Sequence, residues 1–135
     1  MTAYVTKATT TGGRDGRAIL EDGGFGLAMA LPKDLGGSGQ GMNPEQLFAL
    51  GYSSCFGSAI LAMSRKHGVD GSKASVTAEV TLEKDEISFA LKVAISVKMP
   101  GIERDVAEKV LHDAHEICPY SRATRGNVPV TLTLV

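Results

Sequence analysis

The sequence predicts an α+β fold in which a mainly antiparallel sheet wraps around one long, buried central helix. Segments with strand and helix patterns are segregated along the chain, whereas parallel βαβ units would alternate them regularly. A helical segment of about 23 residues begins at position 44 and carries no charge from Leu47 to Ser64. Two later segments, between residues 76 and 97, alternate apolar and polar side chains as half-buried strands do.

The composition is that of one ordinary globular domain. The chain has 135 residues, of which 43% are hydrophobic and 21% charged, and its formal net charge is -1. A chain of this length buries about two-thirds of its unfolded surface in one core, so we expect a single domain over residues 1–135. The balanced charge and the lack of a basic cluster give no electrostatic footprint for nucleic acid or a membrane, and we expect neither as a partner.

Glycine clusters divide the first 40 residues into short segments. Residues 3–10 and 17–31 indicate two or three strands. The N-terminal residues lack the charged-then-apolar pattern of a signal segment, so we expect a cytoplasmic protein. In a reducing compartment, two cysteines far apart in sequence indicate neither a disulfide scaffold nor a zinc ribbon.

The long helix has clear start and stop signals. Asn43 suits the N-cap and Pro44 the first turn, while Glu45 complements the helix dipole. Gly68 can end the helix. Glycine and serine residues dilute its apolar run, which argues against a membrane span. A soluble helix that is apolar on all sides must be buried on all sides, so we expect a second subunit to cover what one sheet cannot. Small residues form one stripe that favours such a helix contact: Gly51, Ser54, Ser58 and Ala62.

The C-terminal half predicts a hairpin, a helix and a closing strand. The alternating segments 76–82 and 87–97 form a long antiparallel hairpin. Apolar residues from Val106 to Cys118 mark one face of an amphipathic helix, which Pro119 ends. Residues 128–134 then alternate again as a last strand.

The two cysteines are the first candidates for chemistry. Cys55 lies in the middle of the uncharged helix, and Cys118 lies directly before Pro119. One interpretation is that both are small core residues, as free cysteines usually are. A reactive Cys55 requires a thiolate, and since burial raises the pKa of a thiol, a cation must then lie nearby. Arg14 or Arg17, in the glycine-rich loop at 12–17, could supply it.

Four sequence blocks occur in order along the chain. They are Gly-Gly-Arg-Asp-Gly at 12–16, Asn-Pro-Glu-Gln-Leu-Phe-Ala at 43–49, the cysteine in that same helix, and Cys-Pro-Tyr-Ser at 118–121 followed by Ala-Thr-Arg-Gly-Asn at 123–127. Together they resemble the Ohr branch of the OsmC/Ohr superfamily, the organic hydroperoxide resistance proteins, over nearly the whole chain. Tyr120 and the 123–127 block favour Ohr over its OsmC sister branch, whereas Arg122 departs from the pattern.

The resemblance implies an antioxidant oxidoreductase of the oxidative stress response, an intertwined homodimer in the bacterial cytoplasm. Such a thiol peroxidase reduces organic and fatty-acid hydroperoxides to alcohols and is recycled by dihydrolipoamide or a lipoylated protein, with no bound metal, haem or flavin. Carried onto this sequence, Cys55 is the peroxidatic cysteine that forms a sulfenic acid, and Cys118 is the resolving cysteine that forms a redox-active disulfide with it. Arg14 and Glu45 are the polar pair that activates Cys55 and orients the peroxide, and Arg17 does not match the family position.

The position of Glu45 raises a geometrical question. Ten residues of straight helix place it about 15 Å from Cys55. We therefore hypothesise that Glu45 of one subunit meets Arg14 and Cys55 of a site completed by the other. Alternatively, Glu45 only stabilises the helix through its dipole.

A preference for organic over hydrogen peroxide requires an apolar entrance, because each buried substrate methylene contributes about 0.8 kcal/mol. Residues of the long helix are candidates for lining it, although the same spacing is typical of plain core. These candidates are Leu47, Phe48, Tyr52, Phe56 and Met63.

Two other functions fit the same elements. A hot-dog-like thioesterase would also wrap an antiparallel sheet around a long helix, with Glu45 as its general base and incidental cysteines. A thiol redox-sensing or binding module would cycle between thiol and disulfide without turnover. His112 and His115 have helical spacing suited to a metal, but no further ligands accompany them, so we expect no metal site.

Overall fold

The computed structural model describes all 135 residues, which form two compact units. The first unit comprises Met1–Leu47 and the second comprises Phe48–Val135. Each unit contains its own three-stranded sheet. The expectation of a single domain over residues 1–135 stays a prediction.

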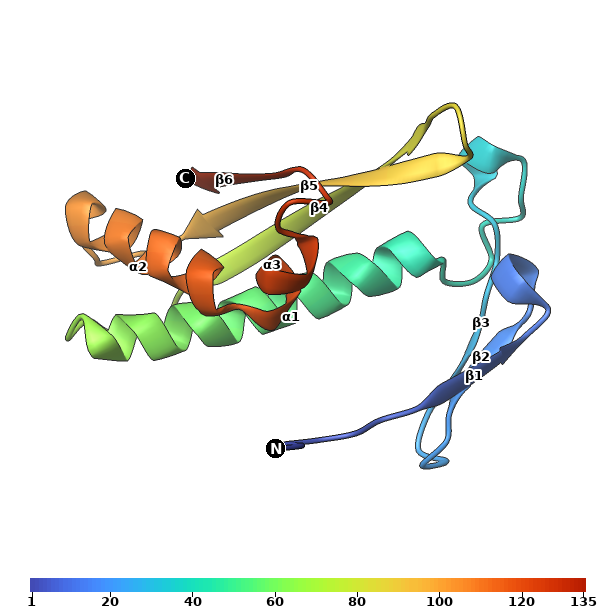
Figure 1. Cartoon of the computed structure of the whole chain (residues 1–135), viewed down its shortest axis with the longest axis horizontal. Coiled ribbons are helices and arrows are strands. Elements are labelled where there is room, and N and C mark those ends of the chain that lie inside the picture. Colours follow the sequence, from blue (N-terminus) through green and yellow to red (C-terminus); the bar gives the residue numbers. More distant parts are fainter. The chain divides into compact units, whose positions relative to one another are not determined.

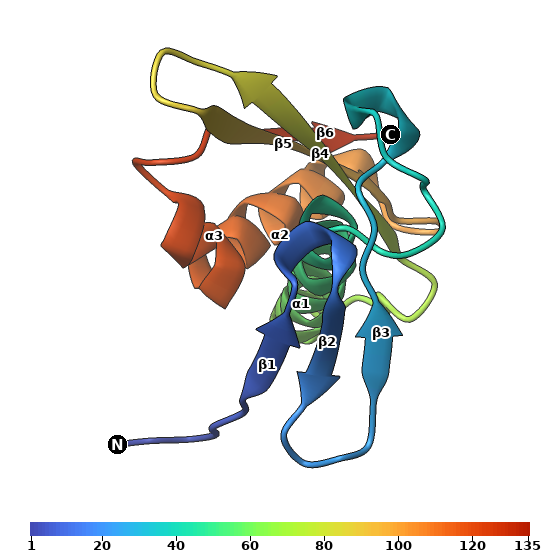
Figure 2. The same cartoon turned by 90° about the vertical axis from the view of Figure 1, so that its right-hand side faces the viewer.

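The first unit is built on a small antiparallel sheet (Figure 2). Its strands are β1 (Ala8–Thr11), β2 (Arg17–Leu20) and β3 (Gly26–Ala28), with β2 in the middle. A single turn of 3-10 helix, η1 (Gly13–Asp15), connects β1 to β2, and a second one, η2 (Lys33–Leu35), follows β3. Strand β1 covers the end of the predicted segment 3–10 and extends one residue beyond it, while β2 and β3 lie within the predicted segment 17–31.

Helix α1 (Pro44–Lys66) begins and ends where the sequence predicts. At its start, the backbone N–H of Gln46 donates to the Asn43 side chain at 2.9 Å. The Gln46 side chain in turn accepts from the backbone N–H of Asn43 at 3.0 Å. This reciprocal capping box satisfies two backbone donors that the helix itself leaves unpaired. Gly68, which follows the last turn, has a φ of +71°, a conformation that glycine adopts at no steric cost.

The sheet of the second unit has the order β4–β5–β6 (Figure 1). Strands β4 (Ser75–Lys84) and β5 (Phe89–Lys98) form the predicted antiparallel hairpin. Strand β6 (Val130–Leu134) pairs with β5 in parallel, because the intervening helices return the chain to the same end of the sheet. The α+β class and the mainly antiparallel pairing are confirmed, although the strands divide into two sheets instead of one.

Two helices connect β5 to β6. Helix α2 (Arg104–Ile117) is amphipathic as predicted, and Pro119 follows its end. Pro119 also begins a short helix, α3 (Pro119–Thr124), which the sequence analysis did not predict. Both roles have one cause, since proline cannot continue a helix but its fixed φ suits the first position of the next one. Cys118 is the single residue between the two helices.

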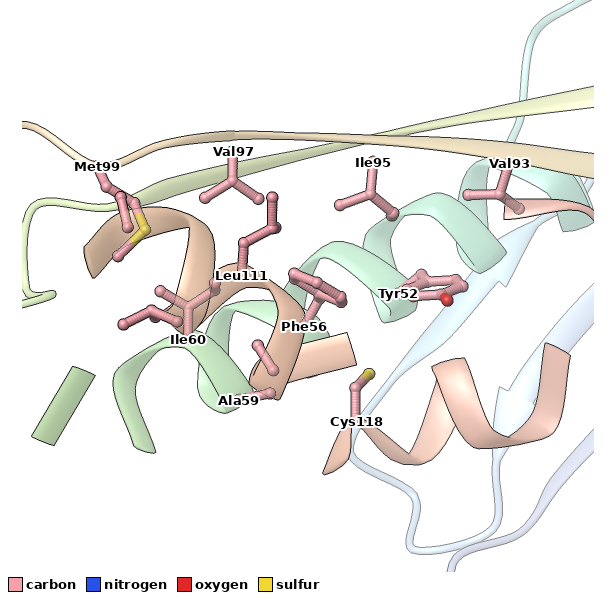
Figure 3. Packing of buried hydrophobic residues seen from close by; sticks show 13 residues of the cluster. Tyr52, Phe56, Ala59, Ile60, Val93, Ile95, Val97, Met99, Leu111 and Cys118 are labelled. Atoms are coloured by element: carbon pink, nitrogen blue, oxygen red, sulfur yellow. The ribbon is translucent and has the colours of Figure 1, made fainter. Parts of the chain in front are cut away.

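The core of the second unit lies between its sheet and its helices. Helices α1 and α2 cover the same face of the sheet in both views (Figures 1 and 2). Val93, Ile95 and Val97 point from β5 toward these helices, as Figure 3 shows. From α1, the side chains that complete this core include Tyr52 and Phe56, neither of which has any exposed surface. The hairpin alternation therefore sets which strand face packs on the helices.

Within one chain, only one face of α1 is buried. The length and apolar composition of this helix would suit a membrane span, but its buried face supplies the core of the second unit. Leu50 and Leu61 remain 57% and 40% exposed. Burial on all sides is thus not achieved by one chain. Gly51, one of the small residues predicted to contact a second subunit, is instead approached by Tyr120 of the same chain. A methyl group at Gly51 would lie 2.9 Å from the Tyr120 hydroxyl.

Candidate active site

The fold brings the two cysteines into contact. Cys55 comes from the middle of α1 and Cys118 from the junction of α2 and α3, and their Sγ atoms lie 3.5 Å apart. Both are free thiols; Cys118 is fully buried and Cys55 is half-buried. A disulfide has an S–S length of about 2.05 Å, so a two-electron oxidant would join the two sulfur atoms with only a small approach.

The surroundings of Cys55 in the second unit favour the neutral thiol. Burial raises the pKa of Cys55, and the contact with the Cys118 thiol raises it further. The backbone amide of Tyr120 lowers the pKa, but by less than burial raises it. Because the thiolate is the nucleophilic form, a reactive Cys55 still requires a cation, as the sequence analysis inferred.

Arg14 and Glu45 form an ion pair within the first unit. Arg14 donates from Nη1 to Glu45 Oε2 at 2.8 Å and from Nη2 to Oε1 at 2.7 Å. This bidentate pair lowers the pKa of Glu45 and raises that of Arg14, with the hydrogen bonds as the main cause in both. Both groups are therefore charged at neutral pH, and the guanidinium keeps further N–H donors for another partner.

This pair corrects one hypothesis of the sequence analysis. We expected Glu45 to meet the Arg14 of another subunit, but the two residues pair within one chain. Arg14 lies in η1, and the loop after β3 brings the first turn of α1 to it. Arg17, the other cation considered, is an exposed residue at the start of β2. Because both arginines belong to the first unit and Cys55 to the second, the choice of activating cation stays a prediction.

An apolar cavity of about 350 Å³ opens in the second unit. Phe48 of α1 and Tyr120 of α3 form part of its wall, with ring centroids 6.0 Å apart. The wall also includes one residue of β5 and residues that follow Tyr120: Leu91, Ala123, Thr124 and Val128. Tyr120 is two residues from Cys118, so the cavity lies next to the segment that carries the buried thiol.

The cavity corrects the predicted substrate lining in part. Tyr52 and Phe56 have no exposed surface and belong to the core, so they do not line an entrance. Phe48 does line the cavity, whereas Met63 packs against the core as a partly buried residue. For Leu47 and Met63 the lining role stays a prediction. Tyr120, inside the Cys-Pro-Tyr-Ser block, lines the cavity but is not among the residues predicted to do so.

Side-chain hydrogen bonds that the sequence does not predict join residues near the two cysteines along the chain. The buried Ser121 hydroxyl lies 2.8 Å from the Tyr52 hydroxyl and 2.8 Å from His115 Nδ1. No pattern of spacing along the chain indicates these contacts, because they join three different helices.

His112 and His115 do not converge with further ligands, since no group of three His, Cys, Asp or Glu residues could hold a metal ion.

Comparison with known proteins places this chain in a family. The sequence model of the OsmC-like protein family matches residues 37–133, which is more than half of the chain. The chain therefore belongs to the OsmC-like family. Within it, the chain stands with the organic hydroperoxide resistance, or Ohr, proteins. It is 39% identical over 133 residues to the organic hydroperoxide resistance protein of Xanthomonas axonopodis pv. citri, covering 97% of this chain and 94% of the relative. It is 36% identical over 136 residues to OhrB of Bacillus subtilis, covering 99% of both.

Solved structures agree with this placement. An organic hydroperoxide resistance protein from Legionella pneumophila superimposes with a TM-score of 0.94 at 42% identity, covering 99% of this chain and 98% of the other. One from Vibrio cholerae, with captopril bound in one of the active sites, gives 0.94 at 41% identity, covering 99% and 93%. OhrB of Bacillus subtilis gives 0.88 at 37% identity, covering 98% of each chain. The predicted family resemblance and fold class are confirmed.

Proposed function

We propose that this protein is a cysteine-based peroxidase that reduces organic hydroperoxides to alcohols. One observation carries the proposal: two free thiols lie 3.5 Å apart in a chain whose relatives are named for organic hydroperoxide resistance. A pair of thiols at this distance can be oxidised and reduced reversibly without large movement. An adjacent apolar cavity suits the organic part of a substrate.

The first step is attack of the Cys55 thiolate on the outer oxygen of the hydroperoxide. The O–O bond breaks, the sulfur becomes a sulfenic acid, and the alkoxide leaves and takes a proton to become the alcohol. Cys55 is the attacking residue because it is half-buried and hence within reach of substrate, whereas Cys118 is fully buried.

The second step is attack of the Cys118 thiol on the sulfenic sulfur of Cys55. A Cys55–Cys118 disulfide forms and water leaves, so two electrons from each thiol pair reduce one hydroperoxide. The short distance between the two sulfur atoms favours this step over a second attack by peroxide, which would give sulfinic acid.

Activation is assigned to Arg14, with Glu45 as the residue that orients it. A fixed guanidinium charge stabilises both the thiolate and the developing charge on the leaving oxygen. The bidentate pair supports this assignment, because two parallel hydrogen bonds fix the plane of the guanidinium. Since burial raises the pKa of Cys55, such a cation is needed for reaction at neutral pH.

The reductant that we propose is a dihydrolipoyl group, as dihydrolipoamide or on a lipoylated protein. Its two thiols become one cyclic disulfide as the Cys55–Cys118 disulfide is reduced to two thiols, so the exchange is balanced. Attack at the Cys55 sulfur, the more accessible of the two, would release Cys118 first. This cycle requires a reductant but no bound cofactor.

We also propose a cytoplasmic homodimer. The exposed apolar residues of α1, Leu50 and Leu61, lie on a helix without charge from Leu47 to Ser64. A second copy of this chain is the occupant that fits, because the same uncharged helix would be available on each subunit. Reduction of the disulfide by dithiols is also compatible with a reducing compartment.

The thioesterase alternative is less well supported. A general base must accept a proton, but the ion pair with Arg14 lowers the pKa of Glu45 and favours its ionised, weakly basic form. The two cysteines would also have no role in such an enzyme, although they are in contact.

A thiol titration tests the proposed function. Free thiols are counted before and after one equivalent of cumene hydroperoxide, then again after dihydrolipoamide is added. We expect two thiols to disappear and to return with dihydrolipoamide, and we expect no disulfide in Cys55→Ser. Folded protein that keeps both thiols would contradict the peroxidase, and acyl thioesters would then be tested. A reaction that occurs once and never repeats with dihydrolipoamide would indicate a redox sensor.

A further inference from the structure

A hydrogen-bonded network of three side chains, those of Tyr52, Ser121 and His115, lies on both sides of the two cysteines in the sequence. Tyr52 precedes Cys55 by three residues on α1, His115 precedes Cys118 by three residues on α2, and Ser121 follows Cys118 by three residues on α3. Ser121 Oγ lies 2.8 Å from Tyr52 Oη and 2.8 Å from His115 Nδ1. The network therefore links the helix turn before Cys55 to both sides of the junction that holds Cys118.

The hydrogen bonds that join Tyr52, Ser121 and His115 are compatible with one another. The Thr124 hydroxyl donates its one proton to the Ser121 carbonyl at 3.1 Å. Its oxygen also lies 3.3 Å from the Tyr52 hydroxyl. With a neutral His115 that accepts at Nδ1, Tyr52 donates to Ser121 and Ser121 donates to the imidazole. Burial first, and then the charge of Arg125, lower the pKa of His115 and favour this neutral form.

The same bonds hold α3 beside a residue that cannot donate a backbone hydrogen bond. Pro119, which follows Cys118, has no backbone N–H to donate. The bond between His115 and Ser121 crosses this junction from α2 to α3, and the bond from Ser121 to Tyr52 fixes α3 to α1. Tyr52, Ser121 and Cys118 are all fully buried, so a shift of α3 would move Cys118 within a packed interior.

We propose that Tyr52, Ser121 and His115 are positioning residues that hold Cys118 within reach of Cys55 and thereby favour disulfide closure. In thermodynamic terms, the network raises the effective concentration of one thiol at the other. This part concerns the thiol pair alone and holds for any oxidant.

The consequence for catalysis rests on the proposed function. The Cys55 sulfenic acid has two fates: reaction with the Cys118 thiol gives the disulfide and water, and reaction with a second hydroperoxide gives sulfinic acid and an alcohol. A displaced Cys118 slows the first reaction and leaves the second unchanged. Breaking the network should therefore make the protein easier to inactivate by excess peroxide while the initial attack by Cys55 keeps its rate.

The test compares variants of the network with a matched control. Tyr52→Phe and Ser121→Ala each remove one hydroxyl, and His115→Leu removes the imidazole nitrogen. His115→Asn is the conservative variant, since its amide can occupy the place of Nδ1. The control is Ser64→Ala. Ser64 is buried like Ser121 but lies on α1, and its hydroxyl has no hydrogen-bond partner. Circular dichroism checks that each variant is folded.

The first measurement is the equilibrium of the Cys55–Cys118 disulfide with reduced and oxidised dithiothreitol. We expect the disulfide equilibrium constant to fall roughly three- to tenfold in Tyr52→Phe and Ser121→Ala, the size expected for one buried hydrogen bond. We expect the disulfide equilibrium constant of Ser64→Ala to equal that of the wild type. The constant of His115→Asn should be closer to the wild-type value than that of His115→Leu. Unchanged equilibria in folded Tyr52→Phe and Ser121→Ala would overturn the inference.

The second measurement is the cumene hydroperoxide concentration that half-inactivates the protein during turnover, with Cys55 sulfinic acid counted by mass spectrometry. We expect this concentration to fall by a similar factor in the network variants and to stay constant in Ser64→Ala. If the wild-type protein forms no disulfide with hydroperoxide, the proposed function fails, yet the dithiothreitol equilibrium still decides on the network. Equal inactivation of wild type and network variants would overturn its catalytic part.

Discussion

The guanidinium of Arg14 and the carboxylate of Glu45 meet through two parallel hydrogen bonds, of 2.8 and 2.7 Å. Arg14 comes from the single turn η1 and Glu45 from the first turn of α1, so a loop residue is oriented by a helix. Only arginine can make both bonds at once, because its donors form a planar fork. The orientation of this cation therefore depends on the residue type and not on charge alone.

Replacing Arg14 by lysine tests this dependence. Arg14→Lys keeps the positive charge but makes at most one bond of the pair, so the charge is no longer held in a fixed plane. We expect kcat/KM for cumene hydroperoxide to fall by about a hundred- to a thousandfold, the scale of a lost preorganised donor. Arg17→Lys is the control and should keep the wild-type kcat/KM. The opposite ranking of the two variants would transfer the activating role to Arg17.

The ion pair also predicts how the stability of the fold depends on pH. The hydrogen bonds from Arg14 lower the pKa of Glu45 below its value in the unfolded chain. The pair's contribution is therefore fully present above the unfolded pKa of about 4.3, and it is lost as the pH falls through the lower, folded pKa. Since Arg14 is 39% exposed and solvent screens the pair, we expect a loss of about 1 kcal/mol or less.

Urea unfolding between neutral and acidic pH measures this effect. Glu45→Gln removes the titrating group, so the free energy of unfolding of this variant should fall less between pH 6 and acidic pH than that of the wild type. Equal pH dependence in both proteins would show that Glu45 does not titrate with folding.

Local signals explain why so much of the fold could be predicted. Asn43 and Gly68 delimit α1 through capping, which depends only on neighbouring residues. The alternation of the hairpin likewise specifies its buried face without reference to the rest of the chain. Helix α3 could not be found in this way, because its six residues are too few for a periodic pattern and Pro119 read only as a stop.

The candidate site was predicted less completely because its contacts are long-range. The pairing of Cys55 with Cys118 came from a family resemblance, and no spacing along the chain would have given it. Tyr52 and Phe56 were expected at an entrance but lie in the core, since helical spacing is the same for both roles. The contact of Ser121 with Tyr52 joins residues 69 positions apart and has no local signature.

The apolar cavity predicts a preference among substrates. Phe48→Ala removes a ring from the cavity wall, which weakens contacts with a bulky organic group but not with hydrogen peroxide. We expect the ratio of kcat/KM for cumene hydroperoxide to that for hydrogen peroxide to fall about tenfold, since a lost apolar contact of this size is worth roughly 1–3 kcal/mol. Ile87→Ala, at an apolar residue 94% exposed in the hairpin loop, is the control. An unchanged ratio in Phe48→Ala would exclude the cavity as the substrate site.

The exposed apolar residues of α1 predict the oligomeric state. Leu61→Glu would place a charge on the face that we assign to a second copy, and burying an unpaired carboxylate there is costly. We expect wild-type protein to sediment as a dimer and Leu61→Glu to dissociate at least tenfold more readily, as analytical ultracentrifugation would measure. A wild-type monomer with full peroxidase activity would contradict the proposed dimer.

The two cysteines predict different defects when each is replaced. Cys118→Ser leaves Cys55 able to attack one hydroperoxide but removes the thiol that lies 3.5 Å away and traps the sulfenic acid. We expect the single-turnover rate of alcohol formation to stay within about threefold of wild type, while turnover with dihydrolipoamide falls steeply and sulfinic acid accumulates on Cys55. Cys55→Ser, in contrast, should form no alcohol even in the first turnover. Stopped-flow measurement of one turnover, followed by mass spectrometry of the cysteine-containing peptides, separates the two variants. If folded Cys118→Ser protein had lost its first turnover, Cys118 would take part in the attack on the peroxide. The assignment of separate peroxidatic and resolving roles would then be wrong.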